Sequence, residues 1–255
     1  MRRLPARAMF GAMESAPIVE NAHFQADSGP DSRPDFRHVR DWIFDLDNTL
    51  YCADNGIFAQ IESRMTDYVE GFLSLPRDAA RAVQKELYRQ YGTTLNGLMR
   101  EHDCDAEDYL RFVHDIDLGD LAPDAGLKTA LERLPGRRFV FTNGCANHAA
   151  RILDRIGLAG IFDAVWDIRS MDFVPKPMPE AYARVMAASG VEGPKAAMFD
   201  DLPRNLVPAR ALGMTTVWLK NDALWGKHGP VMEVAKSDID HQTENLTQFL
   251  DSIRI

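Results

Sequence analysis

Two different spacings of apolar residues divide the chain. Between residues 56 and 116 the apolar positions recur every three or four residues, the period of an amphipathic helix, and no stretch has a convincing strand pattern. The repeating positions of the first helix are Ile57, Ile61, Met65, Tyr68, Val69 and Phe72. Pro76 opens a second helix that runs to Tyr91, because proline is favoured in the first turn of a helix. Two shorter helices are predicted at Leu95–Glu101 and Ala106–Val113.

After Leu118 the pattern changes to short apolar strands that alternate with amphipathic helices. With an earlier strand at about Arg40–Asp45, the predicted strands are Arg138–Thr142, Ala164–Ile168, Ala196–Phe199 and Thr215–Leu219. The predicted helices are Pro123–Leu134, Ala146–Ile156, Pro179–Ser189 and Pro203–Leu212, followed by an edge strand near Ile239 and a helix over Glu244–Ile253. Alternating strands and helices are typical of a doubly wound, mostly parallel sheet, so the sequence predicts a Rossmann-like α/β fold.

The helical stretch interrupts this α/β pattern just after the first strand. We therefore predict a core made of residues 38–54 and 117–255, with residues 55–116 inserted as a small helical cap. Residues 1–37 are rich in Arg, Pro, Asp and Ser and lack the continuous apolar segment of a secretory signal. We interpret them as a disordered extension, or as an overextended start upstream of Met9 or Met13.

Composition and charge narrow the classes of function. The chain has 38 acidic and 29 basic residues and a formal net charge of -9, which argues against a nucleic acid as partner. The three cysteines have no metal-ligand spacing and are too few for a disulfide framework, so a reducing, cytoplasmic setting is expected. No apolar run approaches the roughly 20 residues of a membrane helix, so no membrane partner is expected. The negative net charge does not exclude an anionic small molecule as ligand, because local cations, a metal and helix N-termini can hold a phosphate.

The first predicted strand ends in two aspartates one residue apart. Side chains two positions apart in an extended chain point to the same side, so Asp45 and Asp47 can meet one substrate. Two carboxylates at the end of a buried strand suit a nucleophile beside an acid–base group, or a divalent-metal site. An ordinary turn is the alternative, since Asp and Asn commonly begin turns. The position favours a site, because ligands of open α/β sheets bind at the carboxyl ends of strands.

Polar residues stand at three further places along the α/β pattern. Thr142 and Asn143 follow the second strand, where an apolar run breaks into a glycine turn. Lys176 lies between two prolines, and Asp200 and Asp201 end the strand before the next helix. Taken singly, the threonine could belong to a turn, the lysine to a solvated loop and the acid pair to a helix N-cap. Taken together with the first aspartate pair, these residues predict one active site.

Roughly residues 40–220 resemble the haloacid dehalogenase (HAD) superfamily, whose four motifs correspond in order to Asp45-Leu46-Asp47-Asn48-Thr49, Thr142-Asn143, Lys176-Pro177 and Asp200-Asp201. The resemblance implies that Asp45 attacks a phosphoryl group and forms an aspartyl-phosphate. Asp47 would protonate the leaving alkoxide and later deprotonate the attacking water. Thr142 and the N–H groups that follow it, from Asn143 onward, would hold phosphate oxygens, and Lys176 would neutralise charge.

The same resemblance implies a magnesium site. A carboxylate that attacks a phosphate dianion is repelled by about 4 kcal/mol per pair of unit charges at about 4 Å and an effective dielectric of about 20, and Mg²⁺ removes this barrier. The implied ligands are the Asp45 carboxylate, the Asp47 backbone carbonyl, Asp201 as the direct ligand of the acid pair, and Asp200 bound directly or one contact further out. Asn205, where many relatives have another acid, would tune the site, and the Thr49 hydroxyl would brace the turn after the first strand.

The residues present favour phosphate chemistry over other reactions of the superfamily. Its dehalogenases resemble the first motif at the nucleophile but lack the second acid and need no metal, whereas Asp47 is present here. The membrane pumps of the superfamily require membrane helices, which this sequence does not predict. A phosphomutase stays open, because mutases use the same four motifs and differ in how the cap excludes water. A non-catalytic HAD-fold binding protein is a further alternative. Its members usually lose the nucleophile, the lysine or a metal acid, and the residues that count against it by being intact are Asp45, Asp47, Lys176 and Asp201.

Parts of the sequence resemble the pyrimidine 5′-nucleotidase branch of the superfamily. The similar positions are Tyr91-Gly92-Thr93-Thr94-Leu95-Asn96-Gly97-Leu98, His102, Tyr109, Val113 and His114 in the cap, with Asp45–Tyr51, Phe141-Thr142-Asn143, His148-Ala149 and Phe199-Asp200-Asp201 in the core. The resemblance implies hydrolysis of a nucleoside monophosphate such as UMP or CMP, and another small phosphomonoester is the alternative. Several cap side chains suit a packed core or the surface as well as a substrate contact: Asn55, Phe58, Tyr88, Tyr91, His102, Tyr109, Phe112 and His114.

Overall fold

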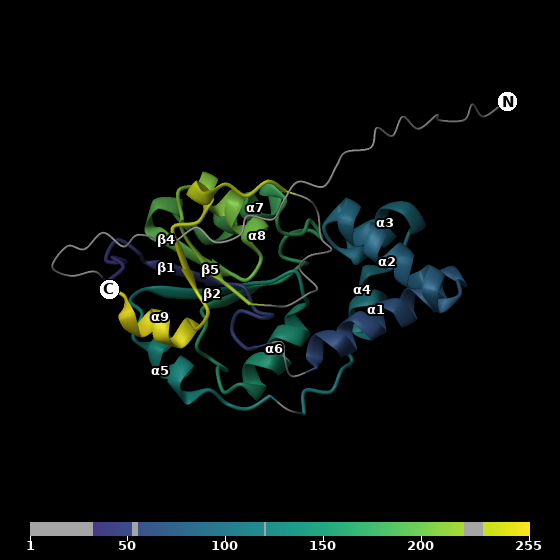
Figure 1. The fold of residues 1–255 in the computed structure, drawn as a ribbon, viewed down its shortest axis with the longest axis horizontal. Coiled ribbons are helices and arrows are strands. Elements are labelled where there is room, and N and C mark those ends of the chain that lie inside the picture. Colours follow the sequence, from purple (N-terminus) through teal and green to yellow (C-terminus); the bar gives the residue numbers. More distant parts are fainter. Residues whose placement is uncertain (1–32, 53–55, 120, 222–231) are drawn as a thin grey trace. The chain divides into compact units, whose positions relative to one another are not determined.

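A six-stranded sheet forms the centre of the fold (Figure 1). The computed structural model describes residues 33–52, 56–119, 121–221 and 232–255. The strands within these ranges are β1 (Asp41–Phe44), β2 (Arg137–Phe141), β3 (Ala164–Trp166), β4 (Ala196–Asp200), β5 (Thr215–Leu219) and β6 (His241–Thr243). Neighbouring strands pair in parallel in the order β3-β2-β1-β4-β5-β6. The predicted doubly wound α/β fold is therefore confirmed.

Strand β1 lies in the middle of the sheet, where both faces are covered. Its four residues are buried, as expected for the near-continuous apolar run of a central parallel strand. Phe44 pairs with Val140 of β2 on one side and with Phe199 of β4 on the other. The chain builds β2 and β3 on one side of β1 and then crosses to β4, β5 and β6 on the other. The carboxyl end of β1 is therefore the switch point, where ligands of open α/β sheets bind.

Five helices of the α/β part cover the sheet, with α7 and α8 on one face and α5, α6 and α9 on the other (Figure 1). Their bounds are α5 (Ala125–Glu132), α6 (Ala146–Arg155), α7 (Pro179–Ser189), α8 (Pro203–Ala211) and α9 (Leu246–Ser252), with 3₁₀ turns η2 (Gly193–Lys195) and η4 (Lys236–Asp238). The Asp124 side chain starts α5 by accepting a hydrogen bond from the Leu127 N–H. The edge strand expected near Ile239 is β6, which begins at His241 and pairs with β5.

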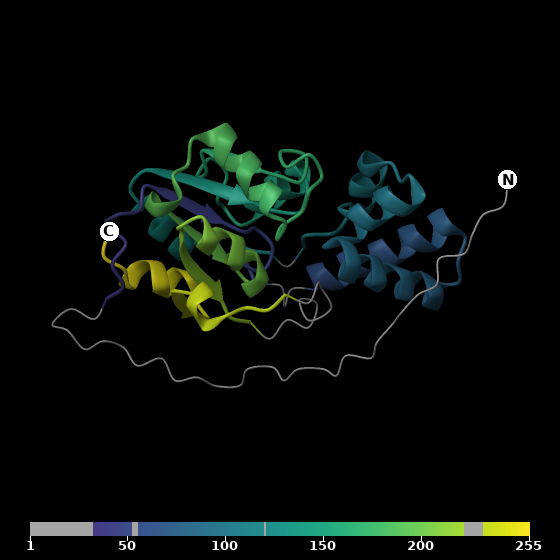
Figure 2. The same ribbon diagram turned by 90° about the horizontal axis from the view of Figure 1, so that it is seen from above.

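Four helices between β1 and β2 lie together beyond the carboxyl ends of the strands (Figure 2). They are α1 (Ile57–Leu73), α2 (Arg77–Tyr91), α3 (Thr94–His102) and α4 (Ala106–Val113), in agreement with the four predicted helices. Gly97 allows α3 to approach α2 closely, because a Cβ at this position would lie 2.7 Å from Leu87 Cβ. We call this group of helices the cap. Among the described residues, no helix has the length and apolar character needed to cross a membrane.

The packed core begins earlier in the chain than the sequence predicted. The composition of residues 1–37 predicts a disordered extension, whereas the Phe36 side chain is fully buried and stacks on Trp42 with ring centroids 5.7 Å apart. The Phe36 N–H also donates to the Arg254 carbonyl oxygen at 2.8 Å, which ties this segment to the C-terminal end. The apolar Phe36 and Val39 side chains explain the difference, since both fill the core. Residues 1–32 of the predicted extension, and Asn55, lie outside the described residues.

Candidate active site

Lys176 holds two of the predicted acidic residues in place. Its side chain is 1% exposed, and its Nζ donates to Asp45 Oδ1 at 2.8 Å, to Asp200 Oδ2 at 2.7 Å and to the Phe141 carbonyl oxygen at 2.7 Å. An ammonium group has three protons, so these contacts use all its donors. Asp45 follows β1 directly, and its N–H continues the pairing with β4 by donating to the Phe199 oxygen at 2.8 Å. The two strand ends and the lysine therefore fix the Asp45 carboxylate.

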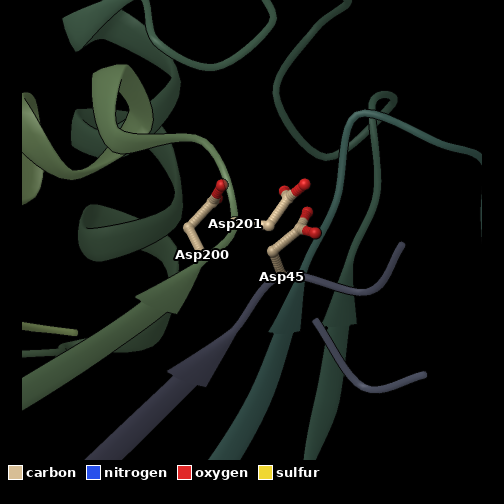
Figure 3. A group of neighbouring side chains, drawn as sticks. All are labelled: Asp45, Asp200 and Asp201. Carbon is tan, nitrogen blue, oxygen red and sulfur yellow. The ribbon is translucent and has the colours of Figure 1, made fainter. Parts of the chain in front are cut away.

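Three buried carboxylates meet at the carboxyl ends of β1 and β4 (Figure 3). One oxygen from each of Asp45, Asp200 and Asp201 can be chosen so that all lie within 4.8 Å of one another. Burial raises the pKa of Asp45 well above its ordinary value; Lys176 opposes this shift, and the charges of Asp200 and Asp201 reinforce it. Burial and the neighbouring Asp200 charge also raise the pKa of Asp201 to about 7.

The charge balance of this cluster suits a divalent cation. One buried lysine faces three buried carboxylates, so negative charge is in excess when all three are ionised. Oxygen ligands supplied by aspartates are those that Mg²⁺ and Ca²⁺ prefer in proteins. The donor set therefore fits the metal that the resemblance implied, with Asp45 and Asp201 as the side chains that line the adjoining cavity.

The two neighbouring acids of the last motif have different surroundings. Asp200 is fully buried and accepts hydrogen bonds from Lys176 Nζ, from the Leu202 N–H at 2.9 Å and from Asn205 Nδ2 at 2.9 and 3.1 Å. Asp201 lines the cavity and accepts a hydrogen bond from Asn48 Nδ2 at 2.9 Å. Asp200 is therefore engaged by protein donors, and Asp201 faces the space where a ligand can enter. The Asn205 amide thus positions Asp200.

The turn after β1 is held by Asn48 rather than by Thr49. Asn48 adopts a positive φ of 66°, a left-handed conformation that Asn tolerates better than most residues, and its amide reaches Asp201. The Thr49 hydroxyl is buried and has no hydrogen-bond partner within the described part of the chain. The expectation that this hydroxyl braces the turn was therefore wrong, because the longer Asn48 amide makes the bond to the last motif.

Thr142 and Asn143 form the turn after β2. Thr142 is 1% exposed, and its Oγ1 accepts a hydrogen bond from the Gly144 N–H at 2.9 Å. The Asn143 side chain makes a reciprocal pair with the Lys176 backbone, accepting from its N–H at 2.8 Å and donating to its carbonyl oxygen at 3.1 Å. A Cβ at Gly144 would lie 3.2 Å from Thr142 Oγ1 and 3.7 Å from Asp47 Oδ2, so glycine preserves the space between them. The Asn143 amide thus positions the lysine loop.

Asp47 is held by two donors that act on one oxygen. His148 Nε2 lies 2.8 Å from Asp47 Oδ1, and the Tyr51 hydroxyl donates to the same oxygen at 2.6 Å. Burial opposes ionisation, but the His148 ring and the Tyr51 hydroxyl hold the pKa of Asp47 below its ordinary value. From the sequence, His148 is linked to the site only by the resemblance to the pyrimidine 5′-nucleotidase branch. The available signal was a histidine on the buried face of α6, next to Ala149 and Ile152.

One cavity of about 200 Å³ brings most of the predicted site residues together. Its floor is lined by six of them, namely Asp45, Asp47, Thr142, Asn143, Lys176 and Asp201. Asp200 lies beneath this floor, fully buried. The cap supplies the opposite wall, where the cap candidates Phe58, Tyr88, Tyr109 and His114 lie together with Gln84. The remaining described candidates, Tyr91, His102 and Phe112, are not part of its lining.

Residues 42–213 match the sequence profile of the haloacid dehalogenase-like hydrolases. The chain belongs to this family. The resemblance inferred from the four motifs is thereby confirmed at the level of the family, and a hydrolase is the coarse function that the match supports. The pyrimidine 5′-nucleotidase branch is a finer assignment that the family match does not decide.

Relatives of this HAD hydrolase include Phosphate metabolism protein 8 of Saccharomyces cerevisiae, which is 28% identical over 189 residues. The match covers 68% of this chain and 59% of the yeast protein, so the chain spans about three fifths of that relative's length. Among solved structures, a HAD phosphatase from Thermococcus onnurineus has a TM-score of 0.55 at 20% identity, over 85% of this chain and 100% of its own. The HAD hydrolase YfnB from Bacillus subtilis, bound to magnesium, has a TM-score of 0.53 at 18% identity, over 85% and 99%. These structures share the fold.

Proposed function

We propose that this HAD hydrolase is a magnesium-dependent phosphomonoesterase that acts through an aspartyl-phosphate on Asp45. The observation that carries the proposal is the pairing of Asp45 with Lys176 at 2.8 Å on the floor of a cavity that also contains Asp47 and Asp201. The arrangement combines a nucleophile, an acid–base group and an acidic cation site. The presence of Asp47 favours phosphoryl transfer over dehalogenation, which needs no second acid.

In the first half-reaction an Asp45 carboxylate oxygen attacks the phosphorus atom of the substrate. The bond from phosphorus to the ester oxygen breaks, and Asp47 gives a proton to the departing alkoxide. Lys176 stabilises negative charge on the nucleophile and on the phosphoryl oxygens, while the Thr142 hydroxyl and the N–H groups of its turn bind those oxygens. The Asn143 amide supports this step by fixing the backbone of Lys176.

In the second half-reaction water replaces Asp45 on phosphorus. Asp47 takes a proton from the water, the water oxygen bonds to phosphorus, and the bond to Asp45 breaks to release phosphate. The lowered pKa of Asp47 keeps this carboxylate ionised in the free site, which is the form that can accept a proton. A bound phosphate dianion raises the pKa of a nearby carboxyl by like-charge repulsion, which suits the acidic role of Asp47 in the first half-reaction.

Asp45, Asp201 and the Asp47 backbone carbonyl would hold Mg²⁺. The ion would supply positive charge that keeps Asp45 ionised against its raised pKa and offsets repulsion of the phosphate dianion. Three buried carboxylates with one lysine support this assignment. The magnesium-bound form of the Bacillus subtilis relative is compatible with it. Asp200 would act on the site through Lys176 and Asn205.

For the substrate we propose a pyrimidine nucleoside 5′-monophosphate. The support is the resemblance of the cap segment Tyr91–Leu98 and of the core segment His148-Ala149 to the pyrimidine 5′-nucleotidase branch. The cap side chains that line the cavity include apolar and aromatic ones, which suit the organic alcohol part of a phosphomonoester. The yeast relative carries phosphate metabolism in its name, which accords with a phosphate ester as substrate.

The test is phosphate release by purified protein with Mg²⁺ from UMP, CMP, AMP, GMP, ribose 5-phosphate and p-nitrophenyl phosphate. We expect release from UMP and CMP above the purine nucleotides, with none from the Asp45→Asn variant. Broad release without a pyrimidine preference keeps the phosphatase and overturns the nucleotidase. An isomeric phosphate ester among the products identifies a mutase. Release of chloride from 2-chloropropionate, with no phosphate from any ester, overturns phosphoryl transfer altogether.

A further inference from the structure

A buried aspartate holds the start of α6, next to the turn that the proposed function assigns to the phosphate. Asp167, which follows β3, is 4% exposed, and its Oδ2 accepts a hydrogen bond from the Ala146 N–H at 2.9 Å. Its Oδ1 accepts from the N–H and the hydroxyl of Ser170, each at 3.1 Å. An N–H in the first turn of a helix has no partner within the helix, so Asp167 supplies one. The carboxylate thus fixes the point at which the turn after β2 enters α6.

The backbone on either side of Asp167 holds the same turn. The Thr142 N–H donates to the Trp166 carbonyl oxygen at 3.0 Å, and the Ile168 N–H donates to the Gly144 carbonyl oxygen at 3.1 Å. We call the segment from Thr142 to the start of α6 the phosphate turn. Three consecutive residues after β3 therefore support this turn, and a shift of that support would move the groups assigned to the phosphate.

Arg169 extends this support to the cap. Its Nη1 donates to Asp167 Oδ2 at 2.9 Å, its Nε donates to Glu107 Oε1 at 2.6 Å, and its Nη2 donates to the second oxygen of Glu107. Glu107 lies in the first turn of α4, on the cap. A guanidinium presents its donors in a planar fork, so one arginine can hold two carboxylates in fixed directions. Side chains alone therefore link α4 to the phosphate turn.

The charges of this link favour its formation. Burial opposes ionisation of Asp167, but the Ala146 N–H and the Arg169 guanidinium hold the pKa of this carboxyl below its ordinary value. The hydrogen bonds from Arg169 also lower the pKa of Glu107. The Glu107 side chain is half exposed, and isolated pairs at such positions contribute little. This pair differs because it is bidentate and continues to a buried acid, which are the conditions that make an exposed pair effective.

We propose that Arg169 is a positioning residue that ties the cap wall of the cavity to the phosphate turn, with Asp167 and Glu107 as its two anchors. Helix α4 supplies three of the residues that line this wall, namely Tyr109, Leu110 and Val113. The inference rests on the proposed function only for the ligand of the turn, and it goes beyond that function by joining the two ends of the cavity. A substrate that spans the cavity then meets a wall and a turn already set for it, so loss of the tie weakens binding more than it slows the reaction steps.

The kinetic test compares Arg169→Met with a matched control, Arg89→Met. Arg89 pairs with Glu86 inside α2 and does not line the cavity. We expect Arg169→Met to raise KM for the best phosphomonoester of the panel about fivefold, the upper range for an exposed ion pair, and to leave kcat within about twofold. Arg89→Met should change neither constant. A loss of kcat at unchanged KM, or an equal effect of the control, overturns the positioning role.

Two further variants test whether the link acts as one unit. Glu107→Gln, which releases only the cap side, should raise KM by a similar factor and should add nothing in the Arg169→Met background. Arg169→Lys keeps the charge and loses the fork, so it should recover only part of the affinity. Additive effects of Glu107→Gln and Arg169→Met overturn the tie.

Amide hydrogen exchange, followed by NMR, separates this inference from the proposed function because it needs no substrate. The Ala146 N–H reports the turn, and the Tyr109 N–H, which donates to the Asp105 carbonyl oxygen at 3.1 Å, reports α4. Both should exchange about threefold faster or more in Arg169→Met than in Arg89→Met, with no change at Val217 in β5.

The exchange rates give distinct outcomes. Equal rates in the two variants at Ala146 or Tyr109 overturn the tie, even where the parent protein hydrolyses UMP. Faster exchange at Val217 as well marks a general loss of stability and also overturns it. Faster exchange confined to the two reporters, in a protein that releases phosphate from no ester, keeps the tie and discards the proposed function.

Discussion

His148 Nε2 lies 2.8 Å from Asp47 Oδ1, a contact that joins residues 101 positions apart in the chain. The His148 side chain is fully buried in the first turns of α6, and its ring stacks on His114 with centroids 4.5 Å apart. Because the ring is fixed by packing, its nitrogen fixes the carboxylate of Asp47. We infer that His148 is a positioning residue, which sets the direction in which the acid–base group meets the substrate.

His148→Ala should lower kcat by roughly 10–100-fold with little change in KM, the usual effect of removing a group that orients a ligand or catalytic side chain. Steady-state kinetics on the best phosphomonoester of the panel measures it. His148→Gln, which can place an amide N–H near the former Nε2, should recover part of the loss. His102→Ala is the control, since that partly exposed histidine is outside the cavity lining. A KM effect without a kcat effect would show that His148 serves only the shape of the cavity.

Asp47→Asn should lower kcat by about 10²–10⁴-fold, because the proton transfers to the leaving group and from water lose their acid and base. In that background His148→Ala should cost almost nothing further, since the histidine acts through the carboxylate that is gone. The double-mutant cycle on kcat measures this coupling. Additive losses from the two substitutions would contradict the assignment of His148 to Asp47.

The strand ends of the site were predictable because each lies at a break in a short apolar run. Asp45 and Thr142 follow strands and Asp200 ends one, and parallel pairing brings the carboxyl ends of such strands together. The His148 contact had no comparable signal. It depends on how α6 packs against the turn after β1, and a buried histidine in a helix is common without any partner of catalytic importance.

Other differences arise from competition between neighbouring residues. Asn48 and Thr49 are both suited to a turn. Only the packing of the turn against Asp201 decides that the Asn48 amide, and not the Thr49 hydroxyl, makes the hydrogen bond that holds it. Phe36 stands in a polar segment, so its composition suggested an extension, yet one aromatic side chain is enough to join the core through Trp42. The cap shows the same limit: periodicity predicted its helices, but which of its aromatic residues face the cavity depends on how each helix is rotated.

Asp45→Asn should abolish turnover while leaving the protein folded, because an amide cannot form the aspartyl-phosphate. The pKa of Asp45 is raised because burial disfavours its ionised form in the folded state, so removing the charge should also raise stability in the absence of metal. At pH 8 in EDTA we expect a melting temperature that is a few degrees higher, where about 1 kcal/mol corresponds to roughly 2–4 °C for a chain of this size. Near-normal activity of this variant would contradict the nucleophile assignment.

EDTA should silence the enzyme, and Mg²⁺ should restore it. Mg²⁺ at about 100 times its Kd should also raise the free energy of unfolding by about 2.7 kcal/mol, because it binds only the folded state. Thermal melting with and without Mg²⁺ measures this directly. Asp201→Asn should lose the shift, whereas Asp251→Asn, an exposed acid that pairs with Arg133, should keep it. Full activity in EDTA would overturn the magnesium assignment.

His114 should make the protein less stable as the pH falls below neutrality. Burial and the neighbouring His148 lower the pKa of His114 to about 3, against an ordinary value of 6.5. Because the pKa of His114 is depressed in the folded state, the unfolded chain takes up the proton first as the pH falls. The stability that the neutral histidine contributes is therefore fully present above pH 6.5 and is lost as the pH falls toward 3. Between pH 7 and pH 5 the free energy of unfolding should fall by at most about 2 kcal/mol. Contact of the half-buried ring with solvent makes this fall smaller.

His114→Phe should remove this pH dependence and keep the stacking on His148. Urea unfolding of both proteins at pH 7 and pH 5 in EDTA gives four free energies of unfolding, and the difference between the two pH effects isolates the contribution that depends on His114. Asp45 and Asp201 titrate alike in both proteins, so their contributions cancel in that difference, whereas Asp47, whose pKa His114 helps to lower, contributes to it together with His114. We expect the parent protein to lose up to about 2 kcal/mol more than His114→Phe between the two pH values. Equal losses would show that the histidine takes up its proton in the folded state as readily as in the unfolded chain.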